Sequence, residues 1–200
     1  MLAMASISSA GTYSWDDGHG EFSSIARSHE VLAVGFQVQP NQEVLQSIEF
    51  FNFWNVANGH AINYHLWTDP TNDGNMIDAV LAQTVATTVD APVGTGNWQS
   101  VNITPTTLAA GSWFYVGISF DDPTFAYFLG AQDTNSPASG NSWEFNWDPN
   151  GPSSPSNLTT GGLNHITDGN LLIRASGVPE PSSMLALLGG AALLLRRRRK

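Results

Sequence analysis

The sequence predicts an all-β protein, and three observations support this. Between about Gly11 and Gly177 no long stretch of apolar residues follows the helical period. Instead, apolar and polar residues alternate in many short runs, which is typical of strands with one buried face. Turn-forming residues separate the runs, and the 200 residues include 19 glycines and 11 prolines. With 42% hydrophobic residues the chain can bury a core, so we expect residues 11–177 to form one domain.

Three runs with regular spacing begin the series of predicted strands. Their alternating apolar positions are Leu32, Val34, Phe36 and Val38, then Ile48, Phe50 and Phe53, then Ile62, Tyr64 and Leu66. The second of these runs, 46–54, is so rich in apolar residues that we expect it to be buried on both faces or bulged. The remaining runs cover residues 80–89, 98–104, 113–120, 125–131, 142–147 and 171–175. Nine strands with turn-rich connections favour an antiparallel β-sandwich of the jelly-roll kind.

Charge is distributed very unevenly along the chain. Residues 1–177 contain 16 acidic and two basic residues, a formal charge of −14, whereas the last five residues are all basic. Binding to nucleic acid requires Lys and Arg to neutralise phosphates, so this body is not expected to bind nucleic acid. The absence of cysteine excludes disulfides, thiolate metal sites and a cysteine nucleophile.

The C-terminal segment changes character at Val178. The motif Val178, Pro179, Glu180 and Pro181 is followed by a run, 182–195, that is rich in Leu and Ala and predicts a single transmembrane helix. Its 14 residues would span only about 21 Å of a bilayer core of about 30 Å, so snorkelling and local thinning would have to cover the difference. The chain then ends in a basic cluster predicted to stay in the cytoplasm, formed by Arg196, Arg197, Arg198, Arg199 and Lys200.

In this order of motif, helix and basic tail, residues 178–200 resemble the PEP-CTERM sorting signal of Gram-negative bacteria. The resemblance implies that an exosortase recognises the motif at the inner membrane, removes the helix and releases the body to the cell surface or the exopolysaccharide matrix. A permanently tail-anchored envelope protein is the alternative. Residues 1–10 are rich in small side chains, and we expect them to be the remnant of a longer signal peptide.

One acidic loop has the spacing of a calcium site. Asp69, Asp73 and Asp78 offer oxygen atoms, and Gly74 occupies the sixth position of the run, but Val80 stands where a calcium-binding loop needs a bidentate Glu. We favour a β-turn begun by an Asx-type hydrogen bond, which needs no cofactor, and keep calcium as the alternative.

Three tryptophans lie in loop-like, polar surroundings and are candidates for stacking on sugar rings: Trp15, Trp143 and Trp147. The simpler alternative is that they fill the core. The five histidines lack metal-ligand spacing and no Gly-x-Ser-x-Gly motif occurs, so no residue is predicted to be catalytic. We expect a non-enzymatic body that binds extracellular polysaccharide. The alternatives are a secreted polysaccharide-active hydrolase and a purely structural matrix protein.

Overall fold

A computed structural model describes residues 10–26, 29–52, 58–90, 96–120, 128–146, 154–158 and 162–180. Almost all of the predicted signal-peptide remnant lies outside these residues, as do the predicted helix 182–195 and the basic tail. In the part of the chain that is described, no helix is both long and apolar enough to cross a bilayer.

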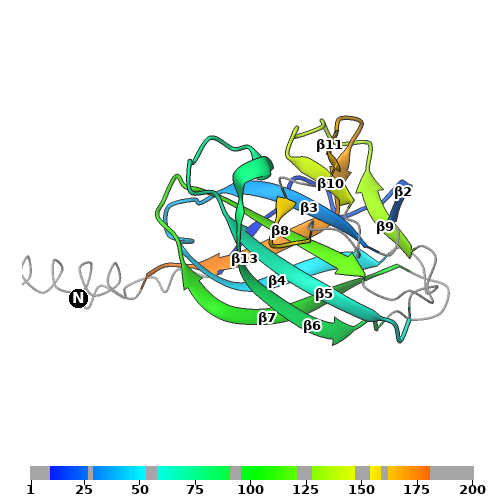
Figure 1. Cartoon of the computed structure of the whole chain (residues 1–200), viewed down its shortest axis with the longest axis horizontal. Coiled ribbons are helices and arrows are strands. Elements are labelled where there is room, and N and C mark those ends of the chain that lie inside the picture. Colours follow the sequence, from blue (N-terminus) through cyan, green and yellow to red (C-terminus); the bar gives the residue numbers. More distant parts are fainter. Residues whose placement is uncertain are drawn as a thin grey trace, which may run out of the picture.

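Two antiparallel sheets make up the described chain (Figure 1). The seven-stranded sheet has the order β1 (Gly11–Tyr13), β13 (Ile173–Val178), β4 (Val44–Asn52), β9 (Phe128–Asp133) and β12 (Asn170–Leu171), while β7 (Asn97–Thr107) pairs with β4 and β2 (Phe22–Ala26) pairs with β9. The six-stranded sheet has the order β11 (Gly162–Ile166), β10 (Ser142–Asn146), β3 (Glu30–Gln37), β8 (Trp113–Phe120), β5 (Ala61–Thr68) and β6 (Val80–Thr88). A single 3₁₀ turn, η2 (Met76–Asp78), lies between β5 and β6. The predicted antiparallel β-sandwich is therefore confirmed.

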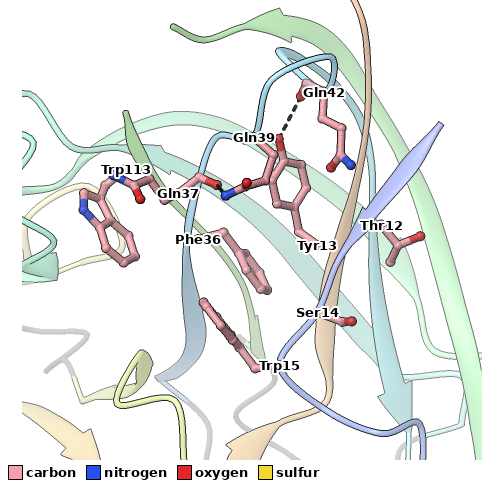
Figure 2. Close-up of a pocket in the computed structure, with 9 residues that line it drawn as sticks. All are labelled: Thr12, Tyr13, Ser14, Trp15, Phe36, Gln37, Gln39, Gln42 and Trp113. Carbon is pink, nitrogen blue, oxygen red and sulfur yellow. Dashed lines mark hydrogen bonds between the residues drawn. The ribbon is translucent and has the colours of Figure 1, made fainter. Parts of the chain in front are cut away.

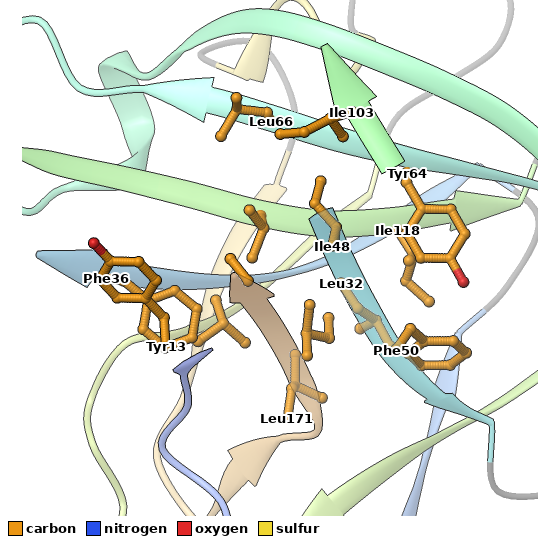
Figure 3. Close-up of a cluster of buried hydrophobic side chains, with 14 of the residues drawn as sticks. Tyr13, Leu32, Phe36, Ile48, Phe50, Tyr64, Leu66, Ile103, Ile118 and Leu171 are labelled. Atoms are coloured by element: carbon orange, nitrogen blue, oxygen red, sulfur yellow. The ribbon is translucent and has the colours of Figure 1, made fainter. Parts of the chain in front are cut away.

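The main core lies between the sheets, where alternate side chains of facing strands meet (Figure 3). From β3 come Leu32 and Phe36, from β4 comes Ile48, and from β8 comes Ile118, each with no more than 2% of its surface exposed. Burying one such side chain contributes about 1.5–3 kcal/mol, so this cluster is the main source of stability.

A second apolar cluster covers the outer face of the six-stranded sheet. Its fully buried members are Val31, Ala33, Trp67, Met76, Tyr115 and Phe145, packed with Leu158 and Ala79. The Trp67 indole N–H donates to the carbonyl of Pro155 at 2.7 Å, which ties the 154–158 segment onto the sheet. Because both faces are covered, β3 and β8 are buried along almost their whole length.

Two glutamine side chains join the sheets along one side. The carboxamide of Gln83 on β6 donates to the carbonyl of Thr104 on β7 at 2.8 Å and accepts from its N–H at 3.0 Å. In return, Gln99 on β7 donates to the Thr88 carbonyl at 2.8 Å and accepts from the Asp90 N–H at 3.0 Å. Each amide occupies backbone groups that an edge strand would otherwise offer to another chain.

Candidate functional site

A pocket of about 290 Å³ opens where β1 meets the end of β3 and the start of β8 (Figure 2). This volume is at the small end of the range for ligand pockets in proteins. The lining residues are Thr12, Tyr13, Ser14, Trp15, Phe36, Gln37, Gln39, Gln42 and Trp113. Aromatic rings and glutamine amides therefore supply most of its surface.

Trp15 is an exposed aromatic ring in a fixed position. Its side chain keeps 40% of its surface in solvent, although large apolar side chains are usually covered. The indole N–H donates to the carbonyl of Gly35 at 2.9 Å, and the ring lies parallel to that of Phe36, with 6.0 Å between centroids and an interplanar angle of 11°. These contacts orient the indole before any ligand arrives.

The backbone around Trp15 is held from three further directions. The buried amide of Asn170 donates to the Trp15 carbonyl at 3.1 Å. The next residue, Asp16, has a fully buried carboxylate, which forms an ion pair with Arg174. The N–H of Asp17 donates to the carboxylate of Asp133 at 2.9 Å. Because a pre-ordered ring loses little conformational entropy on binding, this arrangement is suited to ligand stacking.

The polar side of the pocket is built around Tyr13 and Gln42. The Tyr13 hydroxyl donates to the Gln42 carbonyl at 2.9 Å and accepts from the Gln39 N–H at 3.2 Å, so its hydrogen bonds are used within the protein. Burial raises the pKa of the Tyr13 phenol, which keeps it neutral. By contrast, the side-chain Oε1 of Gln42 is buried and has no hydrogen-bond partner among the described residues. A buried acceptor without a donor costs about 1–3 kcal/mol, so this atom favours a ligand that brings one.

Trp113 forms another wall of the pocket, and the 69–78 loop positions it. The N–H of Trp113 donates to the side chain of Asn72 at 2.7 Å. The indole also packs on Gly74, where an added Cβ would lie 3.1 Å from the ring. Gly74 has a φ of +78°, a conformation that favours glycine, and the contact with Trp113 leaves little room for a Cβ.

The predicted Asx-type turn is present in this loop. The Asp69 carboxylate accepts from the N–H groups of Thr71, Asn72 and Gly74 at 2.7–3.0 Å and from the Thr71 hydroxyl. Oxygen atoms of Asp69, Asp73 and Asp78 lie within 4.8 Å of one another, and such hard oxygen ligands fit calcium. The Asp69 carboxylate already accepts these four hydrogen bonds from the loop itself. Calcium binding stays a prediction.

A second group of carboxylates has the same character. Oxygen atoms of Asp17, Glu21 and Asp133 also lie within 4.8 Å of one another. Burial alone would raise the pKa of Asp133, but hydrogen bonds from Ser136, Asp17 and Asn135 hold this pKa below its ordinary value. The anionic form of Asp133 is therefore stabilised by the protein's own N–H and O–H groups.

Of the other two predicted stacking residues, the structure describes only Trp143, and it does not line this pocket. Trp143 on β10 is half-buried against the second apolar cluster, and the His165 ring lies over it with 4.5 Å between centroids. Trp147 lies outside the described residues.

The proposed sorting motif begins inside the sheet. Val178 is the last residue of β13 and pairs with Val44 on β4, and Pro179 and Glu180 follow directly. Pro181 and the basic residues lie outside the described chain. The neighbouring Gly177 packs so closely on Tyr13 and Gln42 that a Cβ there would lie 2.4 Å from the Gln42 carbonyl oxygen. The strand that leads to the motif therefore borders the pocket.

Comparison with known families decides what this terminal segment is. Residues 177–200 match the PEP-CTERM protein-sorting motif. This PEP-CTERM signal implies an exported protein that an exosortase sorts at the membrane, and the resemblance read from the sequence is confirmed. No curated protein matches the chain significantly.

The body has structural neighbours of low sequence identity. One is described as the cysteine protease and lectin-like domains of Cwp84, a surface layer associated protein of Clostridium difficile, with a TM-score of 0.57 and 16% identity over 86% of this chain and 36% of that one. The chain thus spans about a third of that protein, and the likeness concerns the fold. Two structures of infectious bursal disease virus are more distant. That of the Gt strain has a TM-score of 0.33 and 12% identity over 86% of this chain and 41% of that one. That of the Gx strain has a TM-score of 0.30 and 14% identity over 96% of this chain and 48% of that one.

Most pocket residues were not singled out by the sequence analysis. Trp15 was selected for its loop-like context and Phe36 as a core residue, and the missed residues are Thr12, Tyr13, Ser14, Gln37, Gln39, Gln42 and Trp113. The three glutamines follow one another closely at the end of a predicted strand, and this cluster of amides was a usable signal.

Proposed function

We propose that this chain is an exported protein whose body binds carbohydrate in the pocket around Trp15. The observation that carries the proposal is the exposed indole of Trp15, held in place by its hydrogen bond to Gly35 and by the ring of Phe36. Aromatic rings stack on the apolar faces of sugars, and nearby amides bind their hydroxyl groups. Gln42 supplies such an amide, and its buried Oε1 has no hydrogen-bond partner among the described residues.

The sorting signal supports a place for this activity outside the cytoplasm. We propose that an exosortase of a Gram-negative cell cuts near Pro179 and that the mature protein resides at the cell surface or in the exopolysaccharide matrix. Mass spectrometry of the exported protein tests this directly. A mature C-terminus close to residue 180 supports processing, whereas retention of Arg196–Lys200 favours permanent tail anchoring.

The strand order supports the finer description of the fold as a jelly roll. Four strands of one sheet lie in the order β1-β13-β4-β7, and four strands of the other lie in the order β3-β8-β5-β6. Within each set of four, the first and the last strand in chain order are neighbours, which is the Greek-key feature that jelly rolls contain twice.

We propose that the body has no enzymatic activity. One nucleophile and base do meet, since the Ser119 hydroxyl lies 2.8 Å from Nε2 of His65. However, the two residues are only 1% and 2% exposed, so no substrate reaches them. Incubation with extracted exopolysaccharide tests the hydrolase alternative: release of reducing ends that depends on Asp or Glu side chains would establish it.

Binding itself is tested with an array of glycans and with tryptophan fluorescence of the full chain in detergent. We expect at least one glycan to bind and to shift the emission, and Trp15→Ala to weaken this binding about tenfold. Trp143→Ala is the matched control, because that indole lies outside the pocket. Absence of binding to every glycan would favour the purely structural matrix protein.

A further inference from the structure

Among the described residues that line the pocket, none has a charged side chain. Of its nine lining residues, four are aromatic and five are uncharged polar residues. The Tyr13 phenol is neutral and its hydroxyl is already bound to the Gln42 carbonyl. Recognition of a carboxylate, sulfate or phosphate in a pocket normally uses Arg, Lys or several free N–H groups, and the lining has no Arg or Lys.

The surrounding charge also disfavours an anionic ligand. Arg174 is the sole Lys or Arg within the described ranges, and its guanidinium is occupied. It pairs with Asp16 and lies over the ring of Trp98, 3.9 Å from the centroid. The body carries a formal charge of −14, so the long-range field repels polyanions as well.

One amide of the pocket offers an acceptor to a hydrogen-bond donor. One N–H of the Gln37 side chain donates to the carbonyl of Gly111, and one of Gln39 donates to the carbonyl of Gln37, both at 3.0 Å. The buried Oε1 of Gln42, which is an acceptor, has no partner among the described residues. A sugar hydroxyl can donate to this oxygen, whereas an ionised carboxylate or sulfate has no proton to give and would be repelled.

We propose, on the basis of the carbohydrate-binding function above, that the pocket takes an uncharged sugar unit whose ring stacks on Trp15 and whose hydroxyl donates to Oε1 of Gln42. The volume of about 290 Å³ limits the enclosed part to one or two sugar rings, with the rest of a polysaccharide chain outside the opening. Polysaccharides built from uronic acids or sulfated sugars are excluded by the same features.

The experiment compares two ligands of equal length with the full chain in detergent. One is a neutral hexamer of glucose or mannose, and the other is a hexamer of galacturonate, each titrated calorimetrically at low and at moderate salt. We expect the neutral hexamer to bind at least tenfold more tightly, with an affinity that does not depend on salt.

Variants connect this preference to the named atoms. Gln42→Met keeps the length of the side chain but removes the acceptor, and it should weaken binding of the neutral hexamer about three- to tenfold. Gln46→Met, on the exposed side of β4, is the matched control and should leave binding unchanged. Gln42→Arg should lower the preference for the neutral ligand by attracting galacturonate.

The outcomes separate this inference from the function on which it rests. Tighter binding of galacturonate, weakened by salt, would overturn the neutral-ligand inference and leave carbohydrate binding intact. Neutral binding that is insensitive to Gln42→Met would overturn the role given to its oxygen. Absence of binding to either hexamer and to the whole glycan array would overturn the proposed function itself.

Discussion

Trp15 and Trp67 form the same kind of hydrogen bond in opposite surroundings. Each indole N–H donates to a backbone carbonyl, at 2.9 Å to Gly35 and at 2.7 Å to Pro155. Trp67 is fully buried in the second apolar cluster, whereas Trp15 keeps 40% of its surface exposed at the pocket. In one region the ring fills space in the core, and in the other the same kind of bond fixes a ring that stays exposed to solvent.

The comparison teaches that fixing an aromatic ring and burying it are separate matters. At Trp67 the polar contact satisfies a donor that burial would otherwise leave unpaired. At Trp15 the polar contacts replace burial as the source of order. Stability should therefore depend on the Trp67 region, and ligand affinity on the Trp15 region.

The largest expected effect is the loss of the Trp67 ring. Trp67→Ala leaves a cavity between β5 and the 154–158 segment and should lower the free energy of unfolding by about 3–5 kcal/mol. Chemical denaturation monitored by circular dichroism measures this. Trp15→Ala is the paired variant and should cost about 1 kcal/mol or less because its ring is partly exposed. Equal losses for the two variants would remove the contrast between the regions.

The next largest effect is expected from the pH dependence of stability that His65 causes. Its ring lies next to that of Trp67, with 5.0 Å between centroids. Burial lowers the pKa of His65 to about 4 from 6.5, while Thr84 and Ser119 bind its ring nitrogens. The unfolded chain takes up this proton below about pH 6.5, but the folded chain does so only near pH 4. Stability should therefore fall as the pH decreases through this window, by on the order of 3 kcal/mol.

His65→Gln isolates this contribution from that of the carboxylates, which also titrate in acid. The variant can keep a polar contact with Ser119 but has no group that titrates there. Denaturation at a series of pH values should show a flatter curve between pH 6.5 and 4 for the variant. Parallel curves for the two proteins would contradict the assignment to His65.

A smaller effect, shared between stability and binding, is expected at Arg174. Arg174→Gln leaves the buried carboxylate of Asp16 without its cation and should cost about 2 kcal/mol, less than for a fully buried pair because Arg174 is partly exposed. Because Asp16 follows Trp15 directly, glycan affinity should also fall a few-fold. Arg174→Lys, which keeps the charge but not the planar two-point contact, should lie between the wild type and Arg174→Gln in both measurements.

The smallest effect is expected from calcium. Hydrogen bonds to Asp69 hold this loop together, and a hydrogen bond to Asn72 positions Trp113. Because these contacts need no ion, removing calcium with a chelator should leave the melting temperature unchanged. Differential scanning calorimetry with EDTA and with millimolar calcium checks this. An increase in melting temperature with calcium, abolished by Asp73→Asn, would instead identify an ion site, since a ligand at 100 times its Kd adds about 2.7 kcal/mol.

Much of the fold could be predicted because alternation is a local property. Each of the nine predicted strands overlaps an observed strand within the described residues. The dense 46–54 run corresponds to β4, which is bulged between Leu45 and Ser47 and is not buried on both faces, since only alternate residues such as Ile48 and Phe50 are fully buried. The strands that were missed are short or polar. β1 has only three residues. β11 has the sequence Gly-Leu-Asn-His-Ile, and all five residues are exposed or half-buried. Neither strand therefore shows a clear alternation of apolar and polar residues.

The pocket could be predicted only in part, because its walls come from distant segments. Trp15, Gln42 and Trp113 are brought together by the pairing of β1 with β13 and of β3 with β8. The second apolar cluster was hidden for the same reason, since the segment that covers Trp67 lies 88 residues further along the chain. Local patterns do not record such contacts.

Val178 is shared by the sheet and the sorting motif, and this leaves no spacer between them. A cut within Pro179–Pro181 would leave at most three residues beyond β13, too few to serve as a tether. After such a cut, the released protein could stay near the cell that made it only by binding through its own folded surface.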